Sequence, residues 1–240
     1  MIFIILCSVI VGFLCGATSI GGILLIPAIQ HCLDMDIHLA AGTSLCSFFF
    51  AAMFGTWLHW RSGNLLRSFV VPMCSGGIIF GCLGAFSNVA IESSSLTAIL
   101  AWIIILAGAF SLRPIRSYAK EPVKKNGIVL FAISAFVGFM AGLTGVGGPV
   151  ISVPIMIALG FPPLLSVASA LPLQLVACFS GSIGNFILGK IDWPLAMMTV
   201  LLQIVGFYAG QRAARHIDTE GLKKCVAFLC IGTGIIMLVR

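Results

Sequence analysis

Two Gly-Gly pairs, each preceded by hydroxyl side chains, are the residues of this chain best suited to binding chemistry. Gly21-Gly22 follows Thr18 and Ser19, and Gly147-Gly148 follows Thr144. Glycines at a helix break let the backbone approach a ligand, and the N–H groups that open the next helix carry about half a positive charge. Hydroxyl donors add to these amides without a fixed charge. The pattern therefore predicts two half-sites for an anion.

The two motifs are copies of one another. Residues 12–22 read GFLCGATSIGG and residues 138–148 read GFMAGLTGVGG, a constant shift of 126 residues. The correspondence continues, after one inserted residue, at Pro27 with Pro154 and at Ala41 with Ala168. An internal repeat in an apolar chain is typical of secondary transporters, which bind their substrate between the repeats. We therefore expect the anion site to lie between two homologous halves.

Further polar side chains at membrane depth extend the candidate site. They lie in the third apolar segment of each half and are Thr43, Ser44, Ser169 and Gln174. They could line a cavity or form hydrogen bonds between helices, and both interpretations stay open. Weaker candidates are Ser180, Ser182 and Asn185. His59 could be a proton-sensitive group, although its neighbours Trp60 and Arg61 are ordinary interface anchors.

Four other glycines predict helix packing rather than binding. They have G-x-x-x-G spacing and are Gly12, Gly16, Gly138 and Gly142. Small residues at this spacing let two helix backbones approach closely in a membrane. The Gly-Gly pairs could also serve packing alone. Their recurrence beside hydroxyls in both halves favours a functional role.

The composition is that of an integral membrane protein. The chain of 240 residues is 60% hydrophobic and 8% charged, with a mean hydropathy of +1.17, whereas about 25% of a soluble domain is charged. The net charge of +6 does not indicate nucleic-acid binding, because the basic residues fall in short connections between apolar runs. The apolar segment from Ile2 to Cys15 has no basic residue before it, so we expect a membrane helix rather than a signal peptide.

The sequence lacks the residues that several functional classes require. The nine cysteines form no C-x-x-C pair, and we interpret them as packing residues with no metal or cofactor. All seven acidic residues fall in connections or at their edges, which disfavours a metal or sodium carrier. G-x-S-x-G, H-E-x-x-H and paired carboxylates are absent, so the chain is predicted not to be an enzyme.

The apolar pattern predicts an all-α bundle with five segments in each half. A crossing of the bilayer core, about 30 Å thick, requires about 20 apolar residues. The segments are expected at 2–17, 23–33, 39–58, 69–90 and 96–112, and at 127–143, 149–160, 163–188, 194–212 and 222–239. The second segment of each half is too short to cross alone and follows a Gly-Gly pair. These two segments are therefore predicted to be broken or re-entrant helices.

Loop charges predict the orientation. The connections near 61–67, 113–125 and 212–224 carry a positive excess and should be cytoplasmic, while those near 34–36, 92 and 190–192 should face outward. These constraints require an odd number of crossings per half, five or three. Both termini then lie outside, and the repeats at 1–112 and 127–240 are inverted about a basic cytoplasmic linker at 113–126.

The glycine motif resembles the signature of the TauE/SafE sulfite-exporter family. The pattern G-x-x-x-G-x-x-G-x-G-G, followed by an apolar run and proline, spans Gly138 to Pro154, and Ser19 replaces one glycine in the copy from Gly12 to Pro27. The stretch Ala40-Ala41-Gly42-Thr43-Ser44 resembles the A-x-G-T-S segment of that family. The resemblance implies a permease for anionic sulfur compounds such as sulfite or sulfonates. The second half has Ala168-Ser169-Ala170-Leu171 instead, so the half-sites cannot be chemically equal.

Three functions remain open from the sequence. The leading one is a carrier of small sulfur anions that works by alternating access between inverted repeats. The others are a permease or channel for another small anion or polar solute, and a membrane scaffold subunit without transport. A scaffold needs no broken helices, which argues against the last. We expect a bacterial inner-membrane protein whose partners are the anion and the bilayer, with a homodimer left open.

Overall fold

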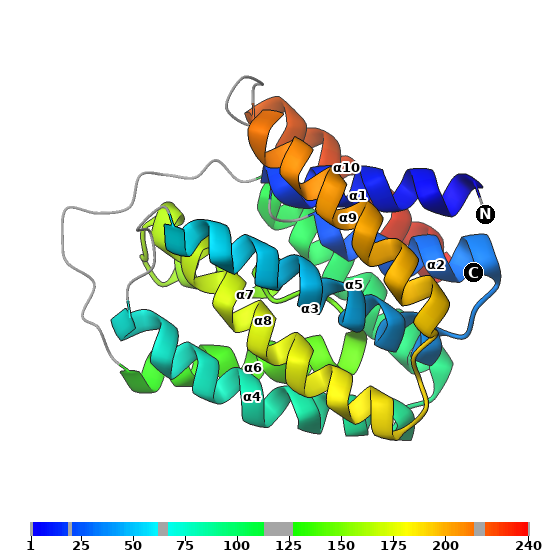
Figure 1. Cartoon of the computed structure of the whole chain (residues 1–240), viewed down its shortest axis with the longest axis horizontal. Coiled ribbons are helices and arrows are strands. Elements are labelled where there is room, and N and C mark those ends of the chain that lie inside the picture. The colour runs from blue at the N-terminus through cyan, green and yellow to red at the C-terminus, as the bar shows by residue number, and fades with distance from the viewer. Residues whose placement is uncertain (1, 19–20, 62–66, 113–126, 214–218, 240) are drawn as a thin grey trace.

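A computed structural model describes residues 2–18, 21–61, 67–112, 127–213 and 219–239. In these ranges the first half contains α1 (Ile2–Thr18), the short 3₁₀ helix η1 (Gly21–Leu24), α2 (Leu25–Leu33), α3 (Ile37–Arg61), α4 (Arg67–Ala90) and α5 (Ser93–Ser111). The second half contains α6 (Gly127–Thr144), α7 (Pro149–Ala158), α8 (Pro163–Ile187), α9 (Trp193–Ala213) and α10 (Thr219–Val239) (Figure 1). The all-α prediction and its ten segments are confirmed.

The bundle is suited to a membrane. Within the described ranges, six helices are long and apolar enough to cross a membrane: α3, α4, α5, α6, α8 and α9. The apolar parts of α1 and α10 are shorter, at Ile4–Thr18 and Lys224–Val239. Large apolar side chains such as Val71, Leu106 and Leu201 are exposed on the outside of the bundle. Because such a surface is unfavourable in water, it indicates contact with lipid.

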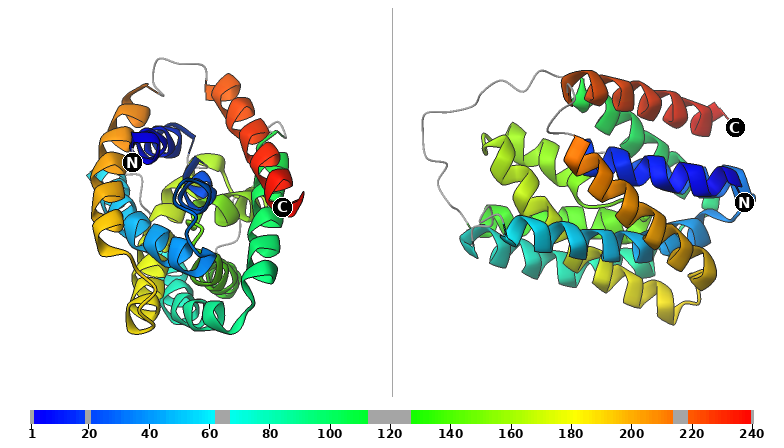
Figure 2. Two further views of the ribbon diagram at one scale, coloured as in Figure 1. Left: turned by 90° about the vertical axis from the view of Figure 1, so that its right-hand side faces the viewer. Right: turned by 45° about the horizontal axis from the view of Figure 1, so that its top comes forward.

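The two halves interlock. The first helix of each half packs against the fourth helix of the other half, so α1 lies along α9 and α6 lies along α4. The third helices, α3 and α8, pack against each other, as do the fifth helices, α5 and α10. If each helix is replaced by its counterpart in the other half, the same set of helix pairs results. The left-hand view of Figure 2 shows the short helices α2 and α7 toward the middle, with the long helices around them.

The G-x-x-x-G glycines lie at these crossings, as the packing interpretation predicts. A methyl group on Gly12 would lie 2.6 Å from the carbonyl oxygen of Gln203, and one on Gly138 would lie 2.9 Å from Cα of Gly77. Methyl groups on Gly16 and Gly142 would run into the carbonyl oxygens of Phe207 and Gly81. No side chain fits between backbones this close, so glycine at these positions allows α1 to pack on α9 and α6 on α4.

Both predicted helix breaks are present. Helix α1 ends at Thr18 and α2 has nine residues, while α6 ends at Thr144 and α7 has ten. The breaks differ in form. Gly21-Gly22 opens the 3₁₀ turn η1, whereas residues 145–147 are non-helical and Gly148 precedes α7. In Figure 1, α1 begins and α10 ends on the right, whereas α5 ends and α6 begins farther left.

Candidate functional site

The break between α6 and α7 is a non-helical segment buried in the bundle. Every residue from 141 to 150 is buried, including the four that connect the helices. Gly145 has φ +76°, and a methyl group there would lie 2.6 Å from the carbonyl oxygen of Ala41 in α3. Only glycine combines this backbone conformation with so close an approach. Irregular backbone at membrane depth occurs where it is enclosed by protein or lines a cavity.

Two backbone N–H groups of this break lack an acceptor among the described residues. The N–H groups of Val150 and Ile151 bond weakly to the carbonyl oxygens of Gly147 and Gly148, at 3.4 and 3.3 Å. Pro149 has no N–H. The consecutive N–H groups of Gly147 and Gly148 precede it and have no partner in the described part of the chain. Buried unpaired donors are costly, and at the positive end of a helix they form an anion-binding arrangement.

Gln174 of α8 lies directly against this Gly-Gly pair. Its side chain is 4% exposed. A methyl group on Gly147 would lie 2.6 Å from Nε2 of Gln174, and one on Gly148 would lie 3.2 Å from its Cα. No described residue forms a hydrogen bond with the carboxamide of Gln174. The structure therefore brings together three of the predicted site residues, because α8 crosses the break at Gln174.

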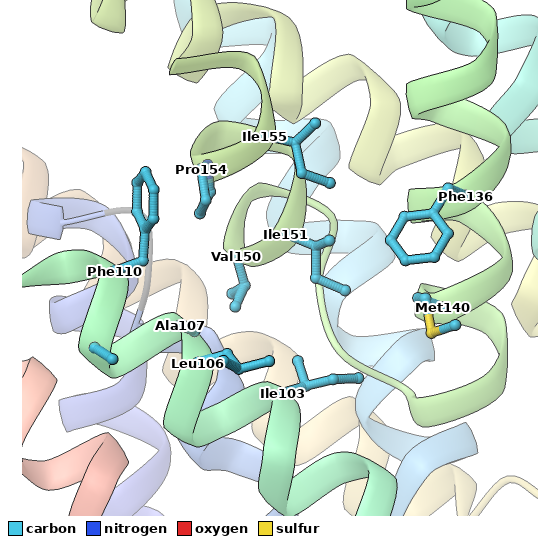
Figure 3. Close-up of a pocket in the computed structure, with 11 residues that line it drawn as sticks. Ile103, Leu106, Ala107, Phe110, Phe136, Met140, Val150, Ile151, Pro154 and Ile155 are labelled. Carbon is cyan, nitrogen blue, oxygen red and sulfur yellow. The ribbon is translucent and has the colours of Figure 1, made fainter. Parts of the chain in front are cut away.

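Ser152 is a fourth polar residue near the break and was not predicted from the sequence. It lies one turn along α7 from Gly148, is fully buried, and its Oγ has no hydrogen-bond partner. The neighbouring side chains of Val150, Ile151, Pro154 and Ile155 line a separate apolar cavity of 340 Å³ toward α5 and α6 (Figure 3). Ser152 falls between them in the helical repeat, on the same face as Met156, which packs with Leu173 of α8. The sequence feature that could have identified Ser152 is its position one helical turn after Gly148.

The first break is filled by its own neighbours. A methyl group on Gly22 would lie 3.7 Å from Sγ of Cys15, so this thiol packs against the glycine. A methyl group on Gly22 would lie 3.2 Å from the ring of Phe48. Thr18 is buried and its hydroxyl donates to the carbonyl oxygen of Leu14 at 2.7 Å. Ser19 and the surroundings of Gly21 lie outside the described residues.

The remaining predicted residues form no hydrogen bond with the Gly147–Gly148 cluster in the described part of the chain. Oγ1 of Thr43 accepts the N–H of Asp192 at 3.0 Å, so this hydroxyl ties α3 to the start of α9. Ser44 and Ser169 are buried in α3 and α8, and Oγ of Ser44 has no partner. Ser180 donates a hydrogen bond to the carbonyl oxygen of Gly77 and so joins α8 to α4. Asn185 donates to the carbonyl oxygen of Gly181 within α8. The side chain of His59 lies outside the described residues.

A buried histidine approaches the same break from another direction. Nδ1 of His38 lies 2.8 Å from Oδ1 of Asn88, and Nδ2 of Asn88 donates to the carbonyl oxygen of Leu143. This chain of contacts joins α3, α4 and the end of α6. It fixes the position of the residue that precedes Thr144. Neither side chain was predicted from the sequence to belong to the site.

The cluster at the second break carries no formal charge. No lysine, arginine, aspartate or glutamate is buried among the described side chains. The groups available to a ligand are the N–H groups of Gly147 and Gly148, the carboxamide of Gln174 and the hydroxyl of Ser152. All four can donate hydrogen bonds. Such a set can hold an anion by dipoles alone.

We expect Thr144→Ala to reduce transport only mildly. The hydroxyl of Thr144 donates to the carbonyl oxygen of Met140 at 2.7 Å and accepts the N–H of Val146 at 3.4 Å. The first bond stays within α6 and the second is long, so truncation removes about 1 kcal/mol of local support. Initial flux in reconstituted vesicles should therefore fall by less than about tenfold. A complete loss would show instead that the hydroxyl contacts the substrate.

Fold and site together define a polytopic membrane protein with broken helices at its centre. The sequence matches the family described as Sulfite exporter TauE/SafE over residues 4–237. The chain therefore belongs to that family of membrane transporters, and the predicted resemblance is confirmed.

Curated relatives cover the same length. The chain is 26% identical over 251 residues to the "Probable membrane transporter protein YdhB" of Bacillus subtilis, covering 98% of this chain and 99% of that protein. It is 25% identical over 274 residues to the "Probable membrane transporter protein YunE" of the same organism, at 98% and 96% coverage. It is 23% identical over 253 residues to the "Probable membrane transporter protein MJ0441" of Methanocaldococcus jannaschii, at 96% and 94% coverage. No solved structure matches the chain significantly.

Proposed function

We propose that this transporter carries a small anion that binds at the break between α6 and α7. The observation that carries the proposal is the pair of N–H groups at Gly147 and Gly148, which belong to buried residues packed against Gln174 and lack acceptors in the described part of the chain. A buried loop with free donors is unfavourable unless a ligand satisfies them. The absence of buried carboxylates in the described ranges favours an anion over a cation.

The substrates we propose are sulfite and organosulfonates. The family description names a sulfite exporter, and these ions present several oxygens to convergent donors. The relatives are named only as probable membrane transporters, so they add support for transport and not for a substrate. We further propose that the protein does no catalysis and lies in a bacterial inner membrane.

Alternating access between inverted repeats is the proposed mechanism. The exchange symmetry of the helix contacts supports it, as do the opposite directions of α1 and α6 in Figure 1. Because the first helix of each half packs on the fourth helix of the other, neither half can move as an isolated body. We propose that α4 and α6 move as one unit and α1 and α9 as the other, and that the buried site between them opens to each side in turn.

Flux in proteoliposomes tests the proposed function. Purified protein would be reconstituted, and entry of labelled sulfite, methanesulfonate and a neutral sugar would be compared with entry into protein-free vesicles. We expect saturable flux of the sulfur anions and none of the sugar. Flux that does not saturate would favour a channel. Absence of flux for every anion, in protein that purifies as a monodisperse species, would favour a scaffold.

We expect both termini outside and the linker at residues 113–126 inside. The linker contains five basic residues and one acidic residue, and basic loops stay in the cytoplasm. The linker itself lies outside the described residues. Single cysteines replacing Ser117 in the linker and Ser94 at the start of α5 would be probed in a cysteine-free variant. A membrane-impermeant maleimide should label Ser94→Cys in intact cells, and Ser117→Cys only after lysis. The reverse pattern would overturn the orientation.

A further inference from the structure

We propose that the second break alone binds the substrate, through uncharged donors, and that the site therefore selects singly charged oxyanions over doubly charged ones. This inference rests on the proposed function and specifies its substrate class. Monovalent sulfonates and hydrogensulfite belong to the favoured class. Sulfate and fully ionised sulfite belong to the excluded class.

The charge of the site sets this preference. The donors at the break are two backbone N–H groups, one carboxamide and one hydroxyl, and no cationic side chain is buried among the described residues. The solvation free energy of an ion grows with the square of its charge, so removing a dianion from water costs about four times as much as removing a monoanion. The attraction to a fixed set of dipoles only doubles. A fixed set of neutral donors therefore favours a monoanion over a dianion.

The first break cannot supply the same donors. The shift that relates Ala41 to Ala168 places Ser47 opposite Gln174 and Leu25 opposite Ser152. The hydroxyl of Ser47 is already paired with Oγ1 of Thr199 at 2.6 Å, and Leu25 is buried and apolar. The positions of the first half that correspond to Gln174 and Ser152 therefore offer no matching pair of free side-chain donors.

Ser152 and Gln174 point to a ligand independently of the helix end. Both side chains are more than nine-tenths buried, and Oγ of Ser152 has no hydrogen-bond partner among the described residues. Nε2 of Gln174 would lie 2.6 Å from a methyl group on Gly147, so the carboxamide packs against this glycine. Gln174 lies beside the amides of the Gly-Gly pair and Ser152 lies one turn along α7 from Gly148, and an oxyanion with three oxygens could satisfy such donors.

Substrate charge is tested with two anions of nearly equal size. Labelled methanesulfonate and sulfate are both tetrahedral and differ by one charge. We expect methanesulfonate to enter wild-type proteoliposomes at least about a hundredfold faster than sulfate. Sulfite flux should rise as the medium is acidified through its second ionisation, while methanesulfonate flux, measured in parallel, corrects for any effect of pH on the protein.

A pair of buried serines tests the assigned donors. Ser8 of α1 is also fully buried with an unpartnered Oγ, so Ser152→Ala and Ser8→Ala make the same chemical change. Removing an unsatisfied hydroxyl should leave the melting temperature unchanged or raise it in both variants. We expect only Ser152→Ala to lower methanesulfonate flux, by about tenfold. Equal flux in the two variants would remove Ser152 from the site.

The flux measurements distinguish a failure of charge selection from a failure of anion transport. Comparable flux of methanesulfonate and sulfate would overturn the charge selection and leave anion transport standing. Flux of neither anion, with melting temperatures that show folded protein, would overturn the proposed function and this inference with it. Sulfite flux that falls on acidification while methanesulfonate flux is constant would also contradict the preference for the monoanion.

Discussion

Gln174→Glu should reduce anion flux to the level of protein-free vesicles. The substitution nearly preserves the shape of a side chain that is 4% exposed, so the packing of α8 against the break is retained. It removes an amide donor beside Gly147 and places a carboxylate where the anion would bind. The lost hydrogen bond to a charged group is worth about 1.5 to 3 kcal/mol, and repulsion between like charges adds to it.

Gln203→Glu is the matched control for this prediction. Gln203 is also buried, at 2% exposure, but lies on α9, which packs on α1 and α3. Both variants bury one carboxyl group and should lose similar stability. Initial flux of methanesulfonate, normalised to reconstituted protein, should be abolished in Gln174→Glu and retained in Gln203→Glu. Equal flux in the two would show that Gln174 is a packing residue.

Gly142→Leu should prevent the bundle from assembling. Any side chain at position 142 would run into the carbonyl oxygen of Gly81, and a methyl group would lie 2.9 Å from the backbone nitrogen of Ala85. The obstructing atoms belong to the backbone of α4 and cannot rotate away. Overpacking of a core costs about 1 to 3 kcal/mol when side chains can adjust. Separating two helix backbones should cost more.

Gly232→Leu provides the comparison, because no atom lies within 4 Å of a methyl group placed on Gly232. Size-exclusion profiles of the detergent-extracted proteins would be compared with the wild type. We expect Gly232→Leu to give a single wild-type peak and Gly142→Leu to aggregate or be degraded. A monodisperse, thermally stable Gly142→Leu protein would mean that α4 and α6 are not packed as described.

Periodicity and spacing in the sequence predict most of the architecture. Apolar length gave ten segments whose limits lie close to those of the helices, and the duplicated glycine motif located both breaks. These features follow from local rules, namely the bilayer thickness and the conformational freedom of glycine. The packing role of Gly12 and Gly142 also followed from their spacing.

The surroundings of the candidate site residues could not be predicted from the sequence, because contacts between distant segments determine them. Thr43 was a candidate cavity residue, but its hydroxyl holds the N–H of Asp192, 149 residues away. The sequence treats the two Gly-Gly pairs alike, whereas packing places Phe48 and Cys15 on Gly22 and an unpaired carboxamide on Gly147. Ser152 went unnoticed because one serine in an apolar helix becomes informative only when its burial and its lack of a partner are known.

Locating a bound anion tests the central claim most directly. Crystals of the protein grown with hydrogen selenite, in which selenium replaces sulfur, would be measured at the selenium absorption edge. The account predicts one anomalous peak within hydrogen-bonding reach of the backbone N–H groups of Gly147 and Gly148 and of Nε2 of Gln174. An equal or stronger peak at Gly21-Gly22, or a peak at a site lined by cationic side chains, would contradict it.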